Sequence, residues 1–326
     1  MSVTLHDIIA ARSRLRAYLD PTPLEPAPEL GDGVFLKLEQ VNPTHSFKIR
    51  GALNAVMSLS PNERARGIVT ASSGNHAQAL AYAAHRFGVS ARVVMPTHTP
   101  RRKVAGTARY GAEVILHGEF YDYAEQHARQ LEAQEGLTYI SPYNDPRIIA
   151  GAGTCGLEIL DRLPDVRQIV VPVGGGGLIA GVGTAVHTIN PQVKIIGVNA
   201  LASPAMYNAF EGTDLPQQPD TLAEALSGEI EGDLTIRLSK AHVDRIELVS
   251  EEEIAAAVRW LLAVQGWLIE GGAAVGVAAV LSGKIPLEPG PVAVILTGSN
   301  IDPETLQHVL AHPDQRPAPG GTTPNP

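Results

Sequence analysis

The stretch QIVVPVGGGGLIAG, residues 168 to 181, decides the fold because four consecutive glycines join an apolar strand directly to a helix. The run before Gly174 is short and apolar, as in a strand that is buried on both faces. The residues after Gly177 continue as an apolar helical pattern. A strand that leads straight into a helix is the repeating unit of a parallel α/β sheet.

The same alternation of strand and helix patterns extends over most of the chain. Helical patterns lie between most of the expected strands, which are residues 34–39, 67–72, 91–96, 113–117, 138–141, 168–173, 194–200, 245–250 and 292–298. So many strands predict an α/β fold with two open, mainly parallel sheets and helices on both faces. Ligands of such sheets bind beyond the carboxyl ends of the strands, where the polar and glycine-rich loops of this chain fall.

Composition excludes several classes of protein. The 326 residues carry a formal net charge of −9 and no basic tract, so we expect no nucleic-acid partner. The apolar runs are too short to cross a membrane, and the N-terminus lacks the pattern of a signal peptide. The single cysteine, Cys155, cannot form an internal disulfide and is expected to be a small buried residue on a helix. These features predict a cytoplasmic protein.

The four glycines predict a phosphate site. Bare backbone N–H groups and the following helix N-terminus favour an anion, whereas a simple tight turn would need only one glycine. Residues Gly175 to Ala180 also match the dinucleotide pattern G-x-G-x-x-A. That match is weak, because the next strand ends in Asn199 where a ribose-binding acid is expected. A dinucleotide-dependent oxidoreductase therefore stays a remote alternative.

A second loop, ASSGNH, predicts a seat for a carboxylate. Its hydroxyls, amide and helix-start N–H groups are suitable donors, and helix capping alone would explain only one of them. The residues concerned are Ser72, Ser73, Gly74, Asn75 and His76. Together with the glycine loop, this seat implies a ligand with two anionic ends.

Lys48 stands where a helical pattern begins, a position at which the helix dipole disfavours a cation. Among the six lysines it is the best candidate for chemistry, either as a phosphate-binding charge or as an amine that forms a Schiff base. Phosphate, amine and carboxylate together indicate pyridoxal phosphate carrying an amino acid.

Four motifs carry a resemblance to a known family. HSFKIRGA, SSGNHAQALAYAA, VGGGGLIAG and TGSN occur in the order seen in fold-type II pyridoxal-phosphate enzymes of the serine/threonine dehydratase and serine racemase group. The likeness runs from about residue 4 to residue 309. It implies two α/β domains with the cofactor in the cleft between them, and a homodimer whose small domain closes on the substrate.

The resemblance also implies roles for particular residues. Lys48 would carry the cofactor and move the α-proton, and Ser73 would lie on the opposite face of the ring. The other cofactor contacts would be Phe47, Asn75, Gly174, Gly175, Gly176, Gly177, Glu270 and Thr297. Ser72, Ser73 and His76 would hold the substrate carboxylate. Because Thr297 would meet the pyridine nitrogen with a hydroxyl, the ring is a weaker electron sink, which favours expulsion of a β-substituent.

The sequence departs from the family at several positions. Gly271 and Gly272 follow Glu270, where the family usually has proline. Asn199 and Ala205 stand where many members have metal-binding acids, so we expect no metal site. The segment SPYND, residues 141–145, and Ala152 also differ and concern the substrate rather than the cofactor.

The expected organisation is a large cofactor-binding domain from residues 1–66 and 143–312, a small mobile domain from 67–142 and a disordered tail from 313–326. We expect no C-terminal regulatory domain. The expected reaction is the α,β-elimination of a β-hydroxy amino acid, most simply L-threonine or L-serine, to a 2-oxo acid and ammonia. Alternatives are a serine or aspartate racemase, a dehydratase of 3-hydroxyaspartate or another hydroxy amino acid (including one derived from ectoine), and a non-catalytic binding protein.

Overall fold

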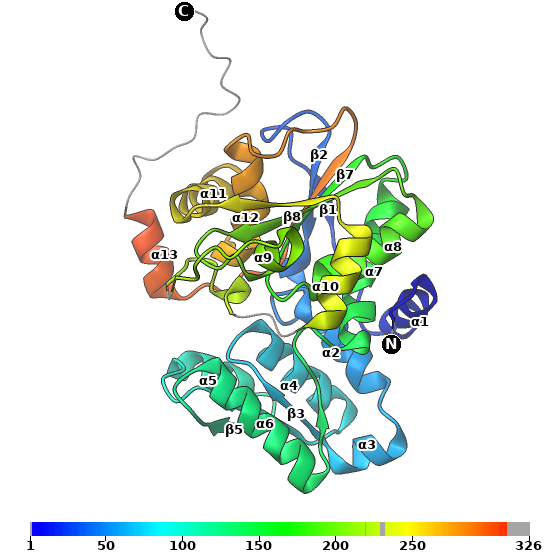
Figure 1. Cartoon of the computed structure of the whole chain (residues 1–326), viewed down its shortest axis with the longest axis vertical. Coiled ribbons are helices and arrows are strands. Elements are labelled where there is room, and N and C mark those ends of the chain that lie inside the picture. The colour runs from blue at the N-terminus through cyan, green and yellow to red at the C-terminus, as the bar shows by residue number, and fades with distance from the viewer. Residues whose placement is uncertain (1, 219, 229–231, 312–326) are drawn as a thin grey trace, which may run out of the picture.

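The computed structural model describes residues 2–218, 220–228 and 232–311, and these residues form two sheets surrounded by helices (Figure 1). The larger sheet has six strands in the order β1–β2–β10–β7–β8–β9. Their bounds are β1 Leu24–Pro26, β2 Val34–Leu38, β7 Gln168–Pro172, β8 Lys194–Ala200, β9 Arg245–Val249 and β10 Val292–Leu296. All neighbours are parallel except β1 and β2. The two mainly parallel sheets confirm the predicted fold class.

The smaller sheet is entirely parallel, in the order β5–β4–β3–β6. Its strands are β3 Ile68–Ala71, β4 Ala91–Met95, β5 Glu113–Leu116 and β6 Thr138–Tyr139. The connecting helices are α4 Asn75–Phe87, α5 Arg101–Ala108 and α6 Tyr121–Glu135, and α3 Pro61–Arg66 precedes β3. This sheet and its helices form the lower unit in Figure 1.

Helices cover both faces of the larger sheet. Val170 of β7 faces a cluster with α11 and α12, whereas its neighbours Ile169 and Val171 face a cluster with α7 and α8. This alternation is the period of two that a strand imposes on its side chains. The helices of this unit are α1 Leu5–Leu15, α2 Lys48–Met57, α7 Pro146–Arg162, α8 Gly177–Ile189, α9 Ala205–Glu211, α10 Asp233–His242, α11 Glu251–Val264, α12 Gly271–Leu281 and α13 Pro303–Leu310, with short 3-10 turns η1 Glu39–Val41 and η2 Glu224–Leu226.

Helix α2 is shared between the two units. Its apolar residues, among them Ile49 and Leu53, lie in one cluster with α4 and the smaller sheet. The same helix packs against α7, since the backbone of Gly51 is so close to Ile148 that an added Cβ would lie 2.9 Å from its carbonyl oxygen. Although every strand of the smaller sheet lies within residues 67–142, its apolar core thus extends beyond that range. The predicted domain bounds stay a prediction.

Buried ion pairs connect α2 to η1 and α7. Arg50 donates two hydrogen bonds to Glu39, of 2.7 and 2.8 Å, and two to Glu158, of 2.6 and 2.7 Å. Lys37 of β2 also donates to Glu158, at 2.6 Å. Burial would raise the pKa of Glu39, but Arg50 and Lys37 outweigh it and hold this pKa at about 2. Complete pairing of this kind is what allows such charges to stay away from water.

Three remaining expectations concern single features. Cys155 lies fully buried in α7, as predicted, and burial raises the pKa of its thiol well above the usual value. Within the described part of the chain, no helix is both long and apolar enough to cross a membrane. The predicted disordered tail, 313–326, lies outside the described residues.

Candidate active site

Three loops at the carboxyl end of the larger sheet are joined by backbone hydrogen bonds, and they surround the start of α2. The N–H of Phe47 donates to the carbonyl of Thr297 at 2.9 Å, and the N–H of Ser299 donates to the carbonyl of His45 at 3.0 Å. The N–H of Glu270 donates to the carbonyl of Gly298 at 3.2 Å. These bonds bring together the lysine motif, the TGSN motif and the glutamate that the sequence singled out separately.

Lys48 is the first residue of α2, and its partly buried side chain reaches toward the smaller sheet. The amine donates a 2.8 Å hydrogen bond to the carbonyl of Pro142. Burial lowers the pKa of Lys48 to about 8, and the charge of Glu270 acts in the opposite direction. Near neutral pH a fraction of this amine is therefore unprotonated and able to act as a nucleophile or base.

Asn75 and Glu270 form a polar chain beside this lysine. The side-chain Nδ2 of Asn75 donates to Oε1 of Glu270 at 2.7 Å, and Asn300 donates from its Nδ2 to Oδ1 of Asn75 at 2.7 Å. Glu270 is 8% exposed, and burial raises its pKa to about 7. Asn75, Lys103 and Lys48 oppose that rise, and Glu224 adds to it. Glu270 stands immediately before α12, not on an exposed turn.

The four glycines form a cradle at the start of α8. Gly176 has φ 82°, in the left-handed region, and stands at the N-cap of that helix. A Cβ at Gly174 would lie 2.9 Å from Cα of Leu226, and a Cβ at Gly177 would lie 3.1 Å from Cα of Tyr143. A Cβ at Gly175 would collide with the ring of Tyr143. Only bare backbone fits here, which leaves the N–H groups of the loop available to an anion.

Ser72, Ser73 and His76 lie around the start of α4, at the carboxyl end of β3. Both serines are partly exposed, whereas His76 is 2% exposed. Burial, and then the charge of Lys48, lowers the pKa of His76 to about 3. The carbonyl of Ile140 raises this pKa slightly, although neither ring nitrogen of His76 makes a hydrogen bond among the described residues. His76 is thus a neutral imidazole at physiological pH.

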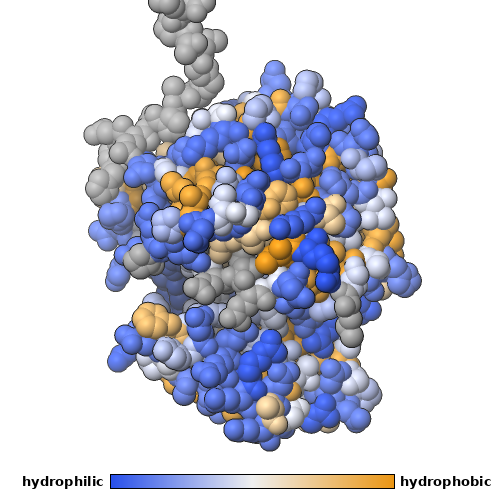
Figure 2. Space-filling model, in the orientation of Figure 1, coloured by the Kyte–Doolittle hydropathy of each residue, from blue (hydrophilic) through white to orange (hydrophobic). Residues whose placement is uncertain are grey.

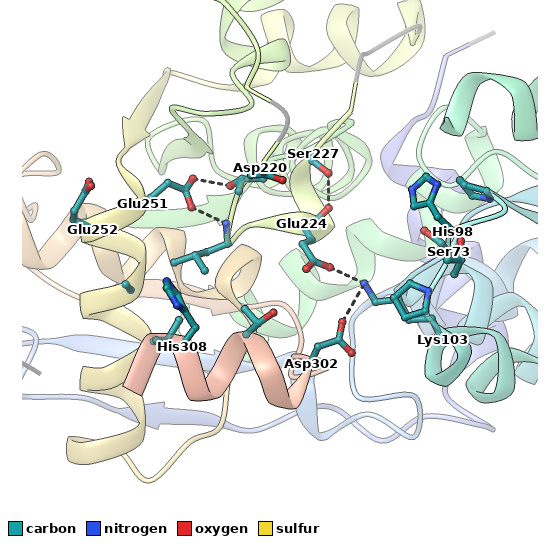
Figure 3. Close-up of a pocket in the computed structure, with 18 of the residues that line it drawn as sticks. Ser73, His98, Lys103, Asp220, Glu224, Ser227, Glu251, Glu252, Asp302 and His308 are labelled. Atoms are coloured by element: carbon teal, nitrogen blue, oxygen red, sulfur yellow. Dashed lines mark hydrogen bonds and ion pairs between the residues drawn. The ribbon is translucent and has the colours of Figure 1, made fainter. Parts of the chain in front are cut away.

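A cleft of about 880 Å³ opens between the two units beside these residues. Ser73, His98 and Lys103 line it from the smaller unit, and Glu224 and Asp302 from the larger one. Lys103 points between those two acids, at 2.6 and 3.4 Å (Figure 3). Seen as a space-filling surface, the face around the two units is mostly hydrophilic, with scattered apolar residues (Figure 2).

The residues of the site fit pyridoxal phosphate. The glycine cradle matches its phosphate, Lys48 supplies the amine, and Asn75 and Thr297 are polar groups at the start of α4 and just after β10. Ser46, next to Phe47, is fully buried with a hydroxyl that makes no hydrogen bond among the described residues. A buried polar atom of this kind is typical of a surface built for a ligand.

Sequence reasoning missed the partners of these residues. Asn300 and Lys103 received no role, although Asn300 lies three residues after Thr297 at the carboxyl end of a strand. Polar residues at that edge were the available signal. No such signal marked Lys103, because its partners lie on segments far away in the sequence.

The positions of the family's metal site are used differently here. The side chain of Asn199 donates to the carbonyls of Val173 and Ser203, at 2.8 and 3.1 Å, and accepts from the N–H of Tyr207. Among the described residues, no group of three or more acids, histidines or cysteines could hold a metal ion. The expected lack of a metal stays a prediction.

Comparisons with known proteins agree with this geometry. A family model described as pyridoxal-phosphate dependent enzyme matches residues 15–298. The chain is 43% identical to an L-threonine ammonia-lyase of Thermotoga maritima, over 94% of this chain and 78% of that protein.

Two solved structures are also similar to the chain. The processed form of threonine deaminase isoform 2 from Solanum lycopersicum is 34% identical, with a TM-score of 0.87 over 95% of this chain and 90% of that one. Maize serine racemase is 30% identical, with a TM-score of 0.88 over 95% and 98% of the two chains. The chain therefore belongs to the pyridoxal-phosphate dependent enzymes, within their fold-type II group of threonine and serine dehydratases.

Proposed function

We propose that this protein is a pyridoxal-phosphate-dependent ammonia-lyase that removes water from L-threonine or L-serine and releases a 2-oxo acid and ammonia. The observation that carries the proposal is Lys48, an amine with a pKa of about 8 that donates to the carbonyl of Pro142, next to the Tyr143 that lies against Gly175 and Gly177, and whose charge acts on His76 of α4. The similarity to an L-threonine ammonia-lyase over nearly the whole chain supports the choice of reaction.

When bound, the cofactor withdraws electrons from the substrate's α-carbon. The residues of the chain provide the rest. The partly unprotonated Lys48 can hold the cofactor and accept the α-proton at its Nζ. The hydroxyls of Ser72 and Ser73, with the first N–H groups of α4, would orient the substrate carboxylate. His76, being neutral, can donate one hydrogen bond to that group without adding a charge.

Three further residues would frame the cofactor. Phe47 is half-buried and packs against the core of the larger sheet, so its position beside Lys48 is fixed. Thr297 offers a hydroxyl at the end of β10 and is 5% exposed. A neutral hydroxyl does not hold a pyridine nitrogen in its protonated form, which favours elimination over transamination.

Of the residues proposed to hold the substrate, only Ser73 lines the cleft between the two units. The charges of that cleft therefore do not decide among the hydroxy amino acids, and 3-hydroxyaspartate is tested beside L-threonine and L-serine. We also expect the enzyme to be a cytoplasmic homodimer, which light scattering would test for its subunit number.

The decisive experiment is to follow the visible spectrum, 2-oxo acid and ammonia with L-threonine, L-serine and 3-hydroxyaspartate in turn. Lys48→Ala is expected to abolish the bound-cofactor absorbance and to lower turnover by at least about a thousandfold. Lys240→Ala, on the exposed surface of α10, is the matched control and should keep both. If the protein is coloured and converts L-serine to D-serine but forms no oxo acid, it is a racemase and not a lyase. A protein that takes up no cofactor would refute the proposal.

A further inference from the structure

Asn300 connects the polar chain of the active site to the backbone. Its Nδ2 donates two hydrogen bonds, one to the carbonyl of Thr44 at 3.0 Å and one to Oδ1 of Asn75 at 2.7 Å. Asn75 in turn donates from Nδ2 to Glu270 at 2.7 Å. Asn75 and Glu270 are 9% and 8% exposed, so water competes little for these bonds.

A backbone carbonyl sets the direction in which these side-chain hydrogen bonds run. A carbonyl oxygen only accepts hydrogen bonds, so Asn300 must turn its NH₂ group toward Thr44. The second proton of that NH₂ then meets Asn75, which must present its oxygen to Asn300. Asn75 consequently turns its own NH₂ toward Glu270, whose carboxylate accepts. The orientation of an asparagine side chain is usually ambiguous, but here the carbonyl of Thr44 determines it.

This orientation matters for the proposed function, on which the inference rests. Of the two protons on Nδ2 of Asn75, one is used by Glu270, and no residue in the described ranges accepts the other. In the holoenzyme that proton would be free to bond to the phenolic oxygen of the cofactor. We propose that Asn300 is a positioning residue that fixes the amide of Asn75 with its NH₂ group toward Glu270 and the cofactor.

A variant that reverses these hydrogen bonds tests the direction in which they run. In Asn300→Asp, residue 300 offers an oxygen to Asn75, which must rotate and present its own oxygen to Glu270. Two acceptors then face each other, and thermal unfolding at pH 8 should occur at a lower temperature. Adding Glu270→Gln supplies an NH₂ group that can donate to the rotated Asn75.

The measurement is a double-mutant cycle on the holoenzyme. Glu270→Gln is expected to raise the unfolding temperature by about 3 °C more in the Asn300→Asp background than in the wild type. A residue that only fills space would give equal shifts in both backgrounds, and that result would overturn the proposal.

A second readout is the dissociation constant of pyridoxal phosphate, measured by fluorescence without substrate. Asn300→Asp should raise it about tenfold, because the rotated Asn75 no longer donates to the cofactor. Glu270→Gln should not restore it, since it leaves Asn75 rotated. If the unfolding cycle shows coupling but Asn300→Asp binds pyridoxal phosphate as tightly as the wild type, the contact of Asn75 with the cofactor is overturned. The proposed lyase activity is tested separately, by the formation of 2-oxo acid and ammonia.

Two further variants guard against general damage. Asn208→Asp alters an asparagine within α9 whose side chain is also hydrogen-bonded: Nδ2 donates to the carbonyl of Leu215 and Oδ1 accepts from Thr213. It should leave the cofactor affinity unchanged. If Asn300→Asp does not fold, Asn300→Ala removes the donor without reversing the chain. It should still weaken cofactor binding severalfold, and an unchanged affinity would overturn the proposal.

Discussion

Glu270 is a carboxyl group that the fold keeps away from water next to a lysine. Burial raises its pKa to about 7, although Asn75, Lys103 and Lys48 all favour its charged form. In the unfolded chain the same group ionises near its ordinary value of 4.5. Folding therefore takes up a proton between these two pH values, and the folded state becomes less stable as the pH rises through that range.

Glu270→Gln removes this pH dependence. Relative to the wild type, the cofactor-free variant should gain on the order of 3 kcal/mol in unfolding free energy between pH 4.5 and pH 8, as the shift in the pKa of Glu270 implies. Urea unfolding at a series of pH values measures it. Stability curves of variant and wild type that run parallel over this range would show that Glu270 titrates normally in the folded protein.

Residues at this scale were only partly predictable. The glycine loop, Lys48 and Asn75 stood out because strand ends with unusual loops are visible in a sequence. Arg50 did not, since a cation two residues after Lys48 resembles any charge on a helix surface, yet it is 1% exposed. Its burial depends on Glu39 and Glu158 meeting it in three dimensions, and no local pattern encodes that meeting.

At the scale of elements, α2 depends on a charged anchor rather than on capping. No side chain caps its N-terminus, where Phe47 has helical backbone angles. Arg50 instead connects the helix to η1 through Glu39 and to α7 through Glu158. The position of Lys48 thus depends on ion pairs that never touch a ligand.

Glu158→Ala is expected to cost about 3 kcal/mol of unfolding free energy, because it leaves Arg50 and Lys37 buried with fewer partners. Chemical unfolding measures the loss. The matched control is Asp161→Ala, which breaks the exposed ion pair between Asp161 of α7 and Arg12 of α1. It should cost less than about 1 kcal/mol of unfolding free energy. Equal losses in the two variants would contradict the anchoring role.

Sequence patterns predicted most of the strands but not all of them. The parallel strands were predictable because each carries an apolar run between turn signals. Strand β1, Leu24–Pro26, was not predicted, and among the described strands of its sheet it is the one that runs antiparallel. A strand of three residues that follows Pro23 and ends at Pro26 shows no periodicity, so only the neighbouring edge of β2 defines it.

For the whole molecule, the cleft is spanned by ion pairs. Lys103 of α5 reaches Glu224 and Asp302, and Arg102 reaches Asp302 at 3.1 Å and the carbonyl of Ile301 at 3.1 Å. Glu224 belongs to η2, whose Leu226 lies against Gly174 of the phosphate cradle. The smaller unit therefore contacts the segment that lies against the proposed phosphate cradle.

Lys103→Glu should open this contact and raise KM by about fivefold with little change in kcat, since part-exposed ion pairs contribute up to about 1 kcal/mol. Adding Glu224→Lys should recover part of the loss. Steady-state kinetics with L-threonine measures both. Arg92→Glu breaks pairs with Glu113 and Glu135 inside the smaller unit and should leave KM unchanged. A swap that recovers nothing would argue against the bridge.

The pairing of β2 with β10 also constrains when the protein can work. In the sheet, Val34–Leu38 lies beside Val292–Leu296, although the ribosome makes the first strand long before the second. Until then β2 lacks its parallel neighbour, and the nascent chain carries an incomplete sheet. Lys48 is translated early, but Thr297 and Asn300 are translated near the end. The cofactor is therefore expected to bind only after synthesis has passed residue 300.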